Sequence, residues 1–486
     1  MITELSITKL LINSEAVAAS DNRTFTRLDP VTGEVATTAA AASVADAQAA
    51  VSAAQAAFPA WSQTSPQERR KLLNRAADIL EARMQEFVDA GVSETGATTL
   101  WISHNVTLAA NIIREAASIV TQIGGEIIPS DKPGSLAMAV ARPLGVCVGI
   151  APWNAPVILG TRAVATPLAC GNTVVLKSSE LCPATHRLIG QCFVDAGLPP
   201  GVINVISNIP EDAGAIVEAL IKAPEVRHVN FTGSTRVGRI IARLAGENLK
   251  PVLLELGGKA PLVVLDDADI DGAVNAAVFG CFLNQGQICM STERIIVDEK
   301  IADIFAEKFA ARAATLPAGD PRGHVVLGGL AMPEGGAKMD ELIADAVAKG
   351  AKVLAGGTRD GAVVSATVVD HVTPAMRIYA EESFGPVKPI IRTRGDEEAV
   401  RVANDTEYGL SAAVFSRDIR RGFAVANSIE SGIIHINGPT VSDEPQMPFG
   451  GVKASGYGRF GGRAGIAAFT QLRWVTVEDS EQPYPF

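Results

Sequence analysis

Six cysteines give this chain six candidate nucleophiles. They are Cys147, Cys170, Cys182, Cys192, Cys281 and Cys289. Because most free cysteines behave as small buried hydrophobic residues, a thiol alone is weak evidence for catalysis. Cys289 follows the segment Asn284 to Ile288, whose glycine and polar side chains indicate a loop that leads the thiol into a cleft. Cys281 lies eight residues earlier, a spacing more typical of packing on one helical face than of a redox pair. From spacing alone, Cys289 is one candidate among six for a nucleophile that reacts as the thiolate.

Glu255 is the candidate base. It ends an apolar run in the segment Leu253-Leu254-Glu255-Leu256-Gly257-Gly258-Lys259. A carboxylate that closes a buried strand is unusual, because burying a charge without a partner is costly. The sequence leaves two alternatives equally open. Glu255 is paired structurally, for example with Lys259, or it is a general base whose pKa is raised by burial.

Two further segments place polar groups directly after apolar runs. Lys177 to Glu180 follows one run, and an acid after a second strand can accept hydrogen bonds from a ribose 2′-hydroxyl. A solvated Lys–Glu loop is the more common explanation. Gly233 and Ser234 open a helix after another run, where backbone N–H groups hold phosphate or simply begin a capped helix. The usual glycine-rich dinucleotide fingerprint does not follow the run at 146–151.

The elements that must position these residues alternate regularly. Apolar runs occur at 146–151, 173–176, 202–206, 227–231 and 252–255, with amphipathic or alanine-rich helical segments between them. This alternation predicts an α/β fold with a parallel, doubly wound sheet covered by helices on both faces. Ligands of such sheets bind at the carboxyl ends of the strands, where the polar segments above lie.

Outside this region the pattern predicts helices first and a projecting hairpin next. Ser43 and Ser65, the latter followed by Pro66, are typical helix starts. Residues 121–142 contain glycines and prolines that punctuate short β-like runs, which predicts a hairpin leading away from the main body.

The second half of the chain continues the alternation. A strand is predicted at 293–298 and a helix at 302–314. Leu472 to Val477 alternates like a strand and precedes a polar, proline-containing tail. That strand pairs either with the edge of another subunit or with a neighbour in its own chain.

Composition excludes several classes of protein. With 486 residues the chain is long enough for two or three domains, and its net charge of −11 argues against nucleic acid or an anionic membrane as the main partner. The first residues, Met1 to Leu5, do not resemble a secretory signal. The cysteines form neither a disulfide framework nor a metal-ligand pattern. We therefore expect a cytoplasmic protein without a metal site.

Taken together, seven short motifs resemble those of the aldehyde dehydrogenase superfamily, in the family's order over nearly the whole chain. They are Pro152-Trp153-Asn154, Lys177 to Glu180, Phe231 to Gly238, Glu255 to Lys259, Gly286 to Cys289, Glu382 to Pro386 and Pro448 to Gly451. The resemblance implies a Rossmann-like NAD-binding domain at 1–120 and 143–254 and an α/β catalytic domain at 255–470. It also implies a small β oligomerisation element at 121–142 and 471–486, and hence a homodimer or homotetramer.

The roles of individual residues follow from this resemblance. Cys289 corresponds to the nucleophile, the Asn154 amide to the oxyanion hole, and Glu255 to the base that activates water for hydrolysis of a thioester. The residues implied in cofactor binding are Trp153, Lys177, Glu180, Gly233, Ser234, Leu256, Glu382 and Phe384. Glu180 favours NAD, because its charge would repel the 2′-phosphate of NADP, although NADP is not excluded.

Further stretches resemble the bacterial vanillin and salicylaldehyde dehydrogenases. Examples are Gln287 to Arg294 and His435 to Val441, and they imply an aromatic aldehyde as substrate, with vanillin the first choice. The residues implied near the substrate are Arg162, Ile288, Met290 and Met447. Alternatives are an aliphatic aldehyde or semialdehyde dehydrogenase and, less favoured, a cysteine-dependent esterase.

Two positions depart from the pattern of many relatives. Arg162 replaces a tryptophan and could meet a phenolic oxygen of the substrate, although a structural ion pair is the preferred explanation. Arg463 replaces a second glutamate proposed to relay protons, which leaves Glu255 as the main candidate base.

Overall fold

The computed structural model describes residues 7–479, 484 and 486. The first five residues, on which the expectation about a secretory signal rests, lie outside the described residues. So do residues 480–483 and 485 of the predicted oligomerisation element.

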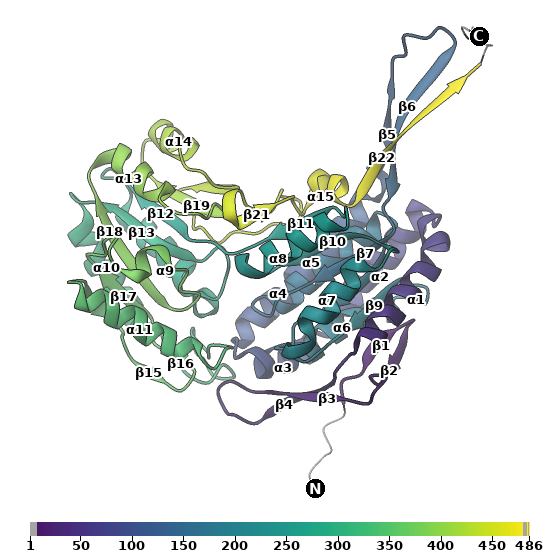
Figure 1. Ribbon diagram of the computed structural model, residues 1–486. Helices are drawn as coiled ribbons and strands as arrows, with labels where there is room; N and C mark the ends of the chain where they lie inside the picture. Colours follow the sequence, from purple (N-terminus) through teal and green to yellow (C-terminus); the bar gives the residue numbers. More distant parts are fainter. Residues whose placement is uncertain (1–6, 480–483, 485) are drawn as a thin grey trace.

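The first of two large sheets contains eight strands in the order β2-β1-β9-β8-β7-β10-β11-β21 (Figure 1). Their bounds are β1 Leu10–Ile12, β2 Glu15–Val17, β7 Val146–Ile150, β8 Thr173–Lys177, β9 Ile203–Ile206, β10 Val226–Thr232, β11 Val252–Glu255 and β21 Gly456–Tyr457. Strands β9, β8, β7, β10 and β11 are parallel, and β1, β2 and β21 run antiparallel to their neighbours. These five parallel strands coincide with the predicted apolar runs.

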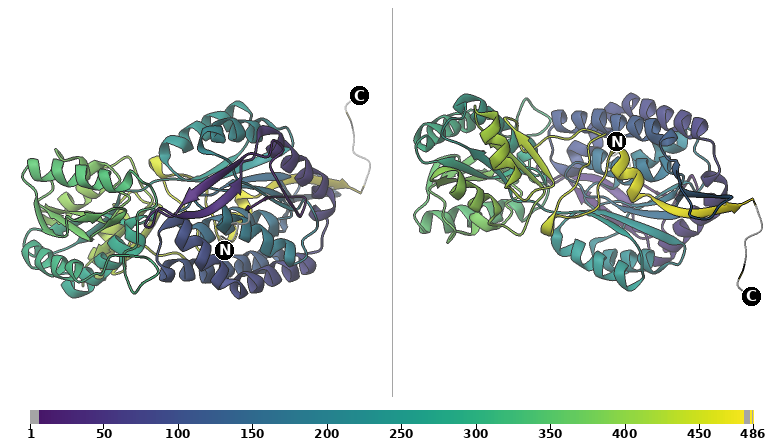
Figure 2. Two further views of the ribbon diagram at one scale, coloured as in Figure 1. Left: turned by 90° about the horizontal axis from the view of Figure 1, so that it is seen from below. Right: turned by 90° about the horizontal axis from the view of Figure 1, so that it is seen from above.

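Helices cover both faces of this sheet (Figure 2), which confirms the predicted doubly wound α/β fold. Helices α2, α3, α4, α5 and α6 pack together on one face, and α1, α7 and α8 lie on the other. Their bounds are α1 Val44–Ser62, α2 Pro66–Ala82, α3 Met84–Thr95, α4 Thr99–Ser118, α5 Pro156–Ala169, α6 Pro183–Asp195, α7 Ala213–Lys222 and α8 Thr235–Glu247. As predicted, Ser43 and Ser65 accept hydrogen bonds at the starts of α1 and α2.

The strand order reverses between β7 and β10. From β7 the chain adds β8 and then β9 on one side, and it returns to add β10 and β11 on the other. In a doubly wound sheet this reversal opens a crevice at the carboxyl ends of the two strands. The residues after β7 and β10 therefore face a common opening.

The second large sheet contains seven strands in the order β14-β17-β18-β13-β12-β19-β20. Their bounds are β12 Ala260–Val264, β13 Thr292–Asp298, β14 Lys352–Ala355, β17 Thr367–Asp370, β18 Val387–Thr393, β19 Ser411–Phe415 and β20 Ile433–Ile436. The sheet is parallel except for β14. Its helices are α9 Ile270–Phe282, α10 Ala302–Ala314, α11 Gly335–Ala348, α12 Arg377–Ala380, α13 Gly395–Asn404 and α14 Ile419–Asn427. The predicted strand at 293–298 and helix at 302–314 correspond to β13 and α10.

A three-stranded arm projects from the main body (Figure 1). Strands β5 (Gly125–Ile128) and β6 (Ser135–Pro143) form the predicted hairpin, and β22 (Thr470–Glu478) pairs with β6 along its whole length. The C-terminal strand is thus an edge strand paired within its own chain.

Smaller elements complete the fold. They are β3 Thr24–Leu28, β4 Val35–Ala40, β15 Arg359–Asp360, β16 Val363–Val364, α15 Gly462–Ala468 and four short 3-10 helices, η1 Ile119–Thr121, η2 Pro210–Asp212, η3 Leu283–Gly286 and η4 Lys453–Ser455. Strand β21 hydrogen-bonds to β11 of the first sheet although it lies within the predicted catalytic domain. The limits of the domains remain a prediction.

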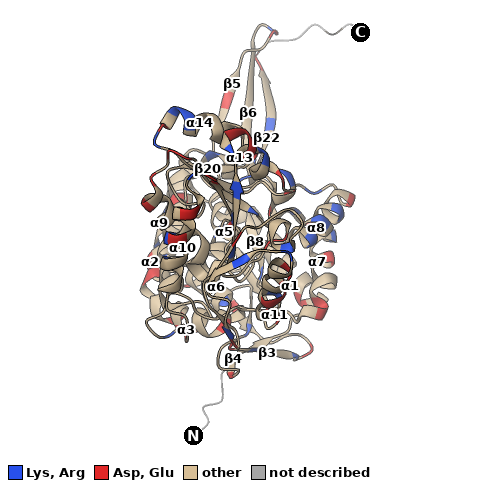
Figure 3. Cartoon of the chain, turned by 90° about the vertical axis from the view of Figure 1, so that its left-hand side faces the viewer, with Lys and Arg blue, Asp and Glu red and all other residues tan. Residues whose placement is uncertain are grey.

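Acidic and basic positions are interspersed over the face shown in Figure 3. None of the helices in the described part of the chain has the length and apolar character needed to cross a membrane.

Candidate active site

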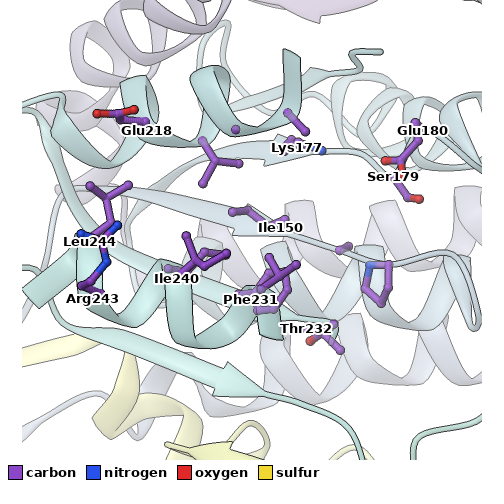
Figure 4. A pocket seen from close by; sticks show the side chains of 18 of the residues that line it. Ile150, Lys177, Ser179, Glu180, Glu218, Phe231, Thr232, Ile240, Arg243 and Leu244 are labelled. Carbon is purple, nitrogen blue, oxygen red and sulfur yellow. The ribbon is translucent and has the colours of Figure 1, made fainter. Parts of the chain in front are cut away.

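A cleft of ≈ 620 Å³ opens at the carboxyl ends of β7, β8 and β10, between α7 and α8 (Figure 4). Four of the residues predicted to bind a cofactor line it: Trp153, Lys177, Glu180 and Gly233. The volume falls within the range of about 300–1,000 Å³ that is typical of small-molecule sites. The cleft therefore has the position and size expected for one half of a dinucleotide.

Lys177 and Glu180 enter this cleft from the end of β8. The Lys177 side chain is buried, and its Nζ donates a hydrogen bond to the Ser178 carbonyl oxygen over 3.1 Å. Burial lowers the pKa of Lys177, and the nearby Glu180 opposes that shift. Glu180 is partly exposed, so its carboxylate can meet a ligand hydroxyl.

A second cavity, of ≈ 230 Å³, adjoins the cleft and shares Trp153, Thr232 and Gly233 with it. The other predicted residues that line it are Asn154, Ser234, Glu255, Leu256, Cys289, Glu382 and Phe384. The N-terminus of α8 begins where the two spaces meet, a favourable place for a phosphate. Ser234 also caps α8, accepting a hydrogen bond from the Val237 N–H over 3.4 Å. The two spaces together fit the two halves of a nicotinamide dinucleotide.

Close packing holds Glu382 against the strand end that carries Glu255. Its Oε1 accepts a hydrogen bond from the Gly258 N–H over 3.0 Å, and a Cβ at position 257 would lie 2.9 Å from Oε2. A larger residue at position 257 would push the Glu382 carboxylate from this position. Burial raises the pKa of Glu382 to about 7.

Phe384 contacts Trp153 in the wall of the second cavity. Their rings meet edge to face, with centroids 5.7 Å apart. Phe384 has a left-handed backbone (φ 51°), a conformation that costs a non-glycine residue free energy and is concentrated at ligand-binding sites. The two aromatic side chains line the second cavity, where a flat ring such as nicotinamide can pack against them.

A buried ion network fixes the loop that carries Glu382 and Phe384. The Glu293 carboxylate forms ion pairs with Lys259 Nζ at 2.9 Å and with Lys388 Nζ at 2.6 Å. It also accepts a hydrogen bond from the Ser383 N–H over 2.8 Å. Lys259 is therefore not the partner of Glu255, and that proposed pairing is wrong. The reason is geometric: after Glu255 the chain continues into β12, which places Lys259 beside β13.

A third cavity, of ≈ 150 Å³, lies on the other side of Cys289 and is mainly apolar. Its walls come from α4, α5, α9 and the segment after β20. The predicted substrate residues Arg162, Ile288 and Met290 line it. Cys289 and Asn154 line both this cavity and the second one. The thiol thus lies between the cavity that suits a cofactor and the cavity that suits a small apolar molecule.

The loop before Cys289 is wound tightly. Asn284, Gln285 and Gly286 all adopt left-handed backbone angles, with φ of 49°, 56° and 72°. A Cβ at position 286 would lie 2.4 Å from the Gly385 carbonyl oxygen, so only glycine fits there. Strain of this kind persists only where the surrounding structure holds it, and it is concentrated at functional sites.

Cys289 is the one cysteine of the six that is not fully buried. Burial raises the pKa of its thiol well above the usual value, and the carboxyls of Glu255 and Glu382 add to that rise, while Arg162 opposes it. The thiol is therefore protonated near neutral pH in the free protein. A nearby base or a bound ligand must assist formation of the thiolate.

Glu255 ends β11 at the rim of the second cavity. Its side chain is buried, and neither carboxyl oxygen has a hydrogen-bond partner within residues 7–479. Burial raises the pKa of Glu255 to about 8, and Arg162 opposes this rise. A buried carboxyl with a pKa of about 8, close to the Cys289 thiol, is suited to act as a general base.

Asn154 is held so that part of its amide group remains available. Its Nδ2 donates to the Gln287 carbonyl oxygen over 2.9 Å, and an amide nitrogen carries two N–H groups. The main-chain carbonyl oxygen of Asn154 accepts hydrogen bonds from Trp101 Nε1 and from Asn284 Nδ2, each over 2.9 Å, which fixes the backbone at this residue. The second N–H of the side chain can therefore donate to an oxyanion beside Cys289.

Arg162 pairs with Asp443 over 2.5 Å in the wall of the third cavity, and its guanidinium lies 4.4 Å from the centre of the Phe449 ring. The structure thus contains the ion pair and also places Arg162 at the cavity. Met447 is 49% exposed and does not line the cavity, because the chain turns after it and directs Phe449 inward. Arg463 is exposed on α15.

Several residues of the cavity wall were not anticipated from the sequence. They are Trp101, His104, Leu108, Ala155, Ile158, Leu159, Phe279, Leu283, Val441, Ser442, Asp443 and Phe449. Trp101 and His104 stack with centroids 5.7 Å apart, and their i, i+3 spacing on α4 was an available signal for a shared helical face. That spacing does not reveal which cavity the face lines.

Comparison with known proteins agrees with this geometry. The aldehyde dehydrogenase family matches residues 17–475. A vanillin dehydrogenase of Pseudomonas fluorescens is 60% identical over 477 residues, covering 98% of this chain and 99% of the relative. The crystal structure of a salicylaldehyde dehydrogenase from Pseudomonas putida G7 complexed with salicylaldehyde has a TM-score of 0.97 at 53% identity, covering 99% of this chain and 100% of that one.

A more distant solved structure bears on the cofactor. It is a betaine aldehyde dehydrogenase from Staphylococcus aureus in complex with NAD+, with a TM-score of 0.94 at 31% identity, covering 99% of this chain and 96% of that one. Aldehyde dehydrogenases use nicotinamide cofactors, consistent with the two joined spaces beside Cys289. The chain belongs to the aldehyde dehydrogenase family.

Proposed function

We propose that this enzyme oxidises an aromatic aldehyde to the carboxylic acid with NAD, through a hemithioacetal and a thioester on Cys289. The observation that carries the proposal is the position of the Cys289 thiol between the cofactor cavity and the ≈ 150 Å³ cavity. An apolar cavity of about 150 Å³ is large enough to bind benzene. The names of the similar vanillin and salicylaldehyde dehydrogenases support the same substrate class.

The side chains have complementary tasks in this scheme. The Cys289 thiolate bonds to the aldehyde carbon, and the Asn154 amide with the Cys289 N–H stabilises the resulting oxyanion. Bound beside Trp153 and Phe384, NAD would supply the acceptor for the hydride that leaves this carbon. Glu255 then takes a proton from water, which attacks the thioester and releases the acid and the Cys289 thiolate.

The substrate class is tested by kcat/KM for vanillin, salicylaldehyde, benzaldehyde, succinic semialdehyde and hexanal, each with NAD and with NADP. The aromatic aldehydes are expected to be the better substrates. Faster oxidation of the aliphatic compounds would overturn the aromatic assignment and favour the alternative of an aliphatic aldehyde or semialdehyde dehydrogenase. Ester hydrolysis that needs no nucleotide and exceeds dehydrogenation would favour the esterase alternative.

The Asn154→Ala variant is expected to lose about 10²–10³ of kcat/KM, because one preorganised donor to the oxyanion is removed. Binding of NAD, measured by calorimetry, should change little, since the amide faces the reacting carbon. A loss well below about tenfold would show that this amide is not the oxyanion donor.

Glu180 supports a preference for NAD. In the Glu180→Gln variant, the ratio of kcat/KM for NADP to that for NAD is expected to rise about tenfold, because repulsion of the 2′-phosphate is removed. The matched control is Glu218→Gln, which removes a carboxylate at the opposite end of the same cleft (Figure 4). A rise of the same size in both variants would show that Glu180 does not select the cofactor.

The exposed arm supports a homodimer or homotetramer. Trp474 and Leu472 of β22 are 81% and 71% exposed, and Ile127 of β5 is 74% exposed. Exposed apolar side chains concentrated on the strands of one projecting arm are typical of an interaction surface. Light scattering after gel filtration measures the mass, and a monomer would contradict this assignment.

The six free thiols support a reducing, cytoplasmic location.

A further inference from the structure

Asp443, in the wall of the ≈ 150 Å³ cavity, has one carboxylate oxygen that accepts no hydrogen bond from the described residues. Asp443 Oδ2 lies 2.5 Å from Arg162 Nη2, while Oδ1 is buried and has no hydrogen-bond partner among the described residues. The Asp443 side chain is only 14% exposed. Buried acceptors in native proteins are nearly always paired, so an unpaired oxygen in a substrate cavity indicates a donor on the ligand.

The guanidinium of Arg162 is already occupied by contacts within the protein. The side chain is 6% exposed, and the guanidinium is bound to Asp443 and lies against the Phe449 ring. The pair therefore leaves an unpaired acceptor, rather than a free cation, in the wall of the cavity. The other polar side chains that line the same cavity are His104, Asn154, Ser442 and Cys289.

We propose that Asp443 Oδ1 accepts a hydrogen bond from a ring hydroxyl of the substrate, so that the cavity selects hydroxybenzaldehydes over benzaldehyde. This inference rests on the proposed oxidation of aromatic aldehydes. A hydroxyl that donates to a carboxylate forms one of the stronger protein hydrogen bonds. A ring without a donor leaves Oδ1 unpaired, and an anionic ring substituent meets the negative charge of Asp443.

The test compares wild type with Asp443→Asn. Asparagine keeps the shape and an oxygen for Arg162, but turns an amide N–H₂ towards the ligand. For each aldehyde, kcat/KM of the variant is divided by kcat/KM of wild type, which cancels the intrinsic reactivity of the aldehyde. The aldehydes are benzaldehyde, 4-fluorobenzaldehyde and the 2-, 3- and 4-hydroxybenzaldehydes.

At least one hydroxybenzaldehyde is expected to lose about 10- to 100-fold more than benzaldehyde and 4-fluorobenzaldehyde, the range for a hydrogen bond to a charged group. The matched control, Ser442→Ala, alters the neighbouring side chain of the same wall and should not separate hydroxylated from unsubstituted rings. An equal loss for all five aldehydes would overturn the inference and leave Asp443 as a residue that only positions Arg162.

A second measurement needs no variant. Acetophenones lack the aldehyde hydrogen and cannot be oxidised in this way, so they are tested as competitive inhibitors of wild type, and at least one hydroxyacetophenone should bind more tightly than acetophenone. Equal inhibition constants would also overturn the inference. Poor oxidation of every aromatic aldehyde by wild type, with good oxidation of hexanal, would instead refute the proposed function.

Discussion

A Cys289→Ala variant is expected to show no measurable NAD reduction with any aromatic aldehyde, a loss of at least about 10⁴-fold in kcat. Without the thiolate the aldehyde has no covalent attachment beside the cofactor cavity, and neither the hemithioacetal nor the thioester can form. The variant should still bind NAD with unchanged affinity, because the adenosine half of the cofactor would occupy the cleft between α7 and α8. Steady-state absorbance at the NADH band and calorimetric titration with NAD measure the two properties.

The matched control is Cys281→Ala. Cys281 is fully buried in α9, and its removal changes packing without reaching either cavity. Near-normal activity of that variant together with none in Cys289→Ala assigns the chemistry to one thiol. Substantial residual activity of Cys289→Ala, with a normal aldehyde dependence, would refute covalent catalysis by this residue.

The parallel sheet was predictable because its strands are buried on both faces. Strands β7, β8, β9 and β11 are mainly apolar, whereas β10 also contains Arg227, His228 and Asn230, and a helix separates each strand from the next, so the alternation rather than composition alone marks the sheet. The starts of α1 and α2 were predictable for a local reason as well: a serine cap is encoded within four residues.

Pairings between distant residues were not predictable in this way. Glu255 and Lys259 lie four residues apart, yet the structure pairs Lys259 with Glu293, whose strand β13 lies beside β12. Arg162 meets Asp443 although 281 positions separate them. Contacts of this kind depend on the packing of two sheets, and local spacing contains no information about it.

Some residues of the candidate site could likewise be predicted from the local sequence pattern, and others could not. The residues that follow strand ends, such as Lys177 and Gly233, could be located from the pattern, because carboxyl ends of parallel strands meet at one edge. Cys289 could not be distinguished from five other cysteines until the family motifs were considered. Met447 and Phe449 are two positions apart, and only the turn between them decides that Phe449 faces the cavity.

A Glu255→Gln variant is expected to form the thioester and then stall. The first turnover should release about one NADH per active site in a rapid burst, and the steady-state rate should fall about 10²–10⁴-fold, the usual contribution of a general base. Stopped-flow absorbance measures the burst, and mass spectrometry of quenched enzyme should detect the acyl group on Cys289. Loss of the burst would refute this assignment and show that Glu255 is needed to form the Cys289 thiolate.

The pH dependence gives an independent check on the same residue. Because burial raises the pKa of Glu255 to about 8, the carboxylate that accepts a proton from water is scarce at pH 7 and predominates above pH 8. The deacylation rate of wild type should therefore rise with pH through this region and level off above it, and the rise should vanish in Glu255→Gln. The amide should not weaken the fold near pH 8, since glutamine replaces a carboxyl whose charge burial disfavours. A stable variant that deacylates at the wild-type rate with the wild-type pH profile would show that another group activates the water.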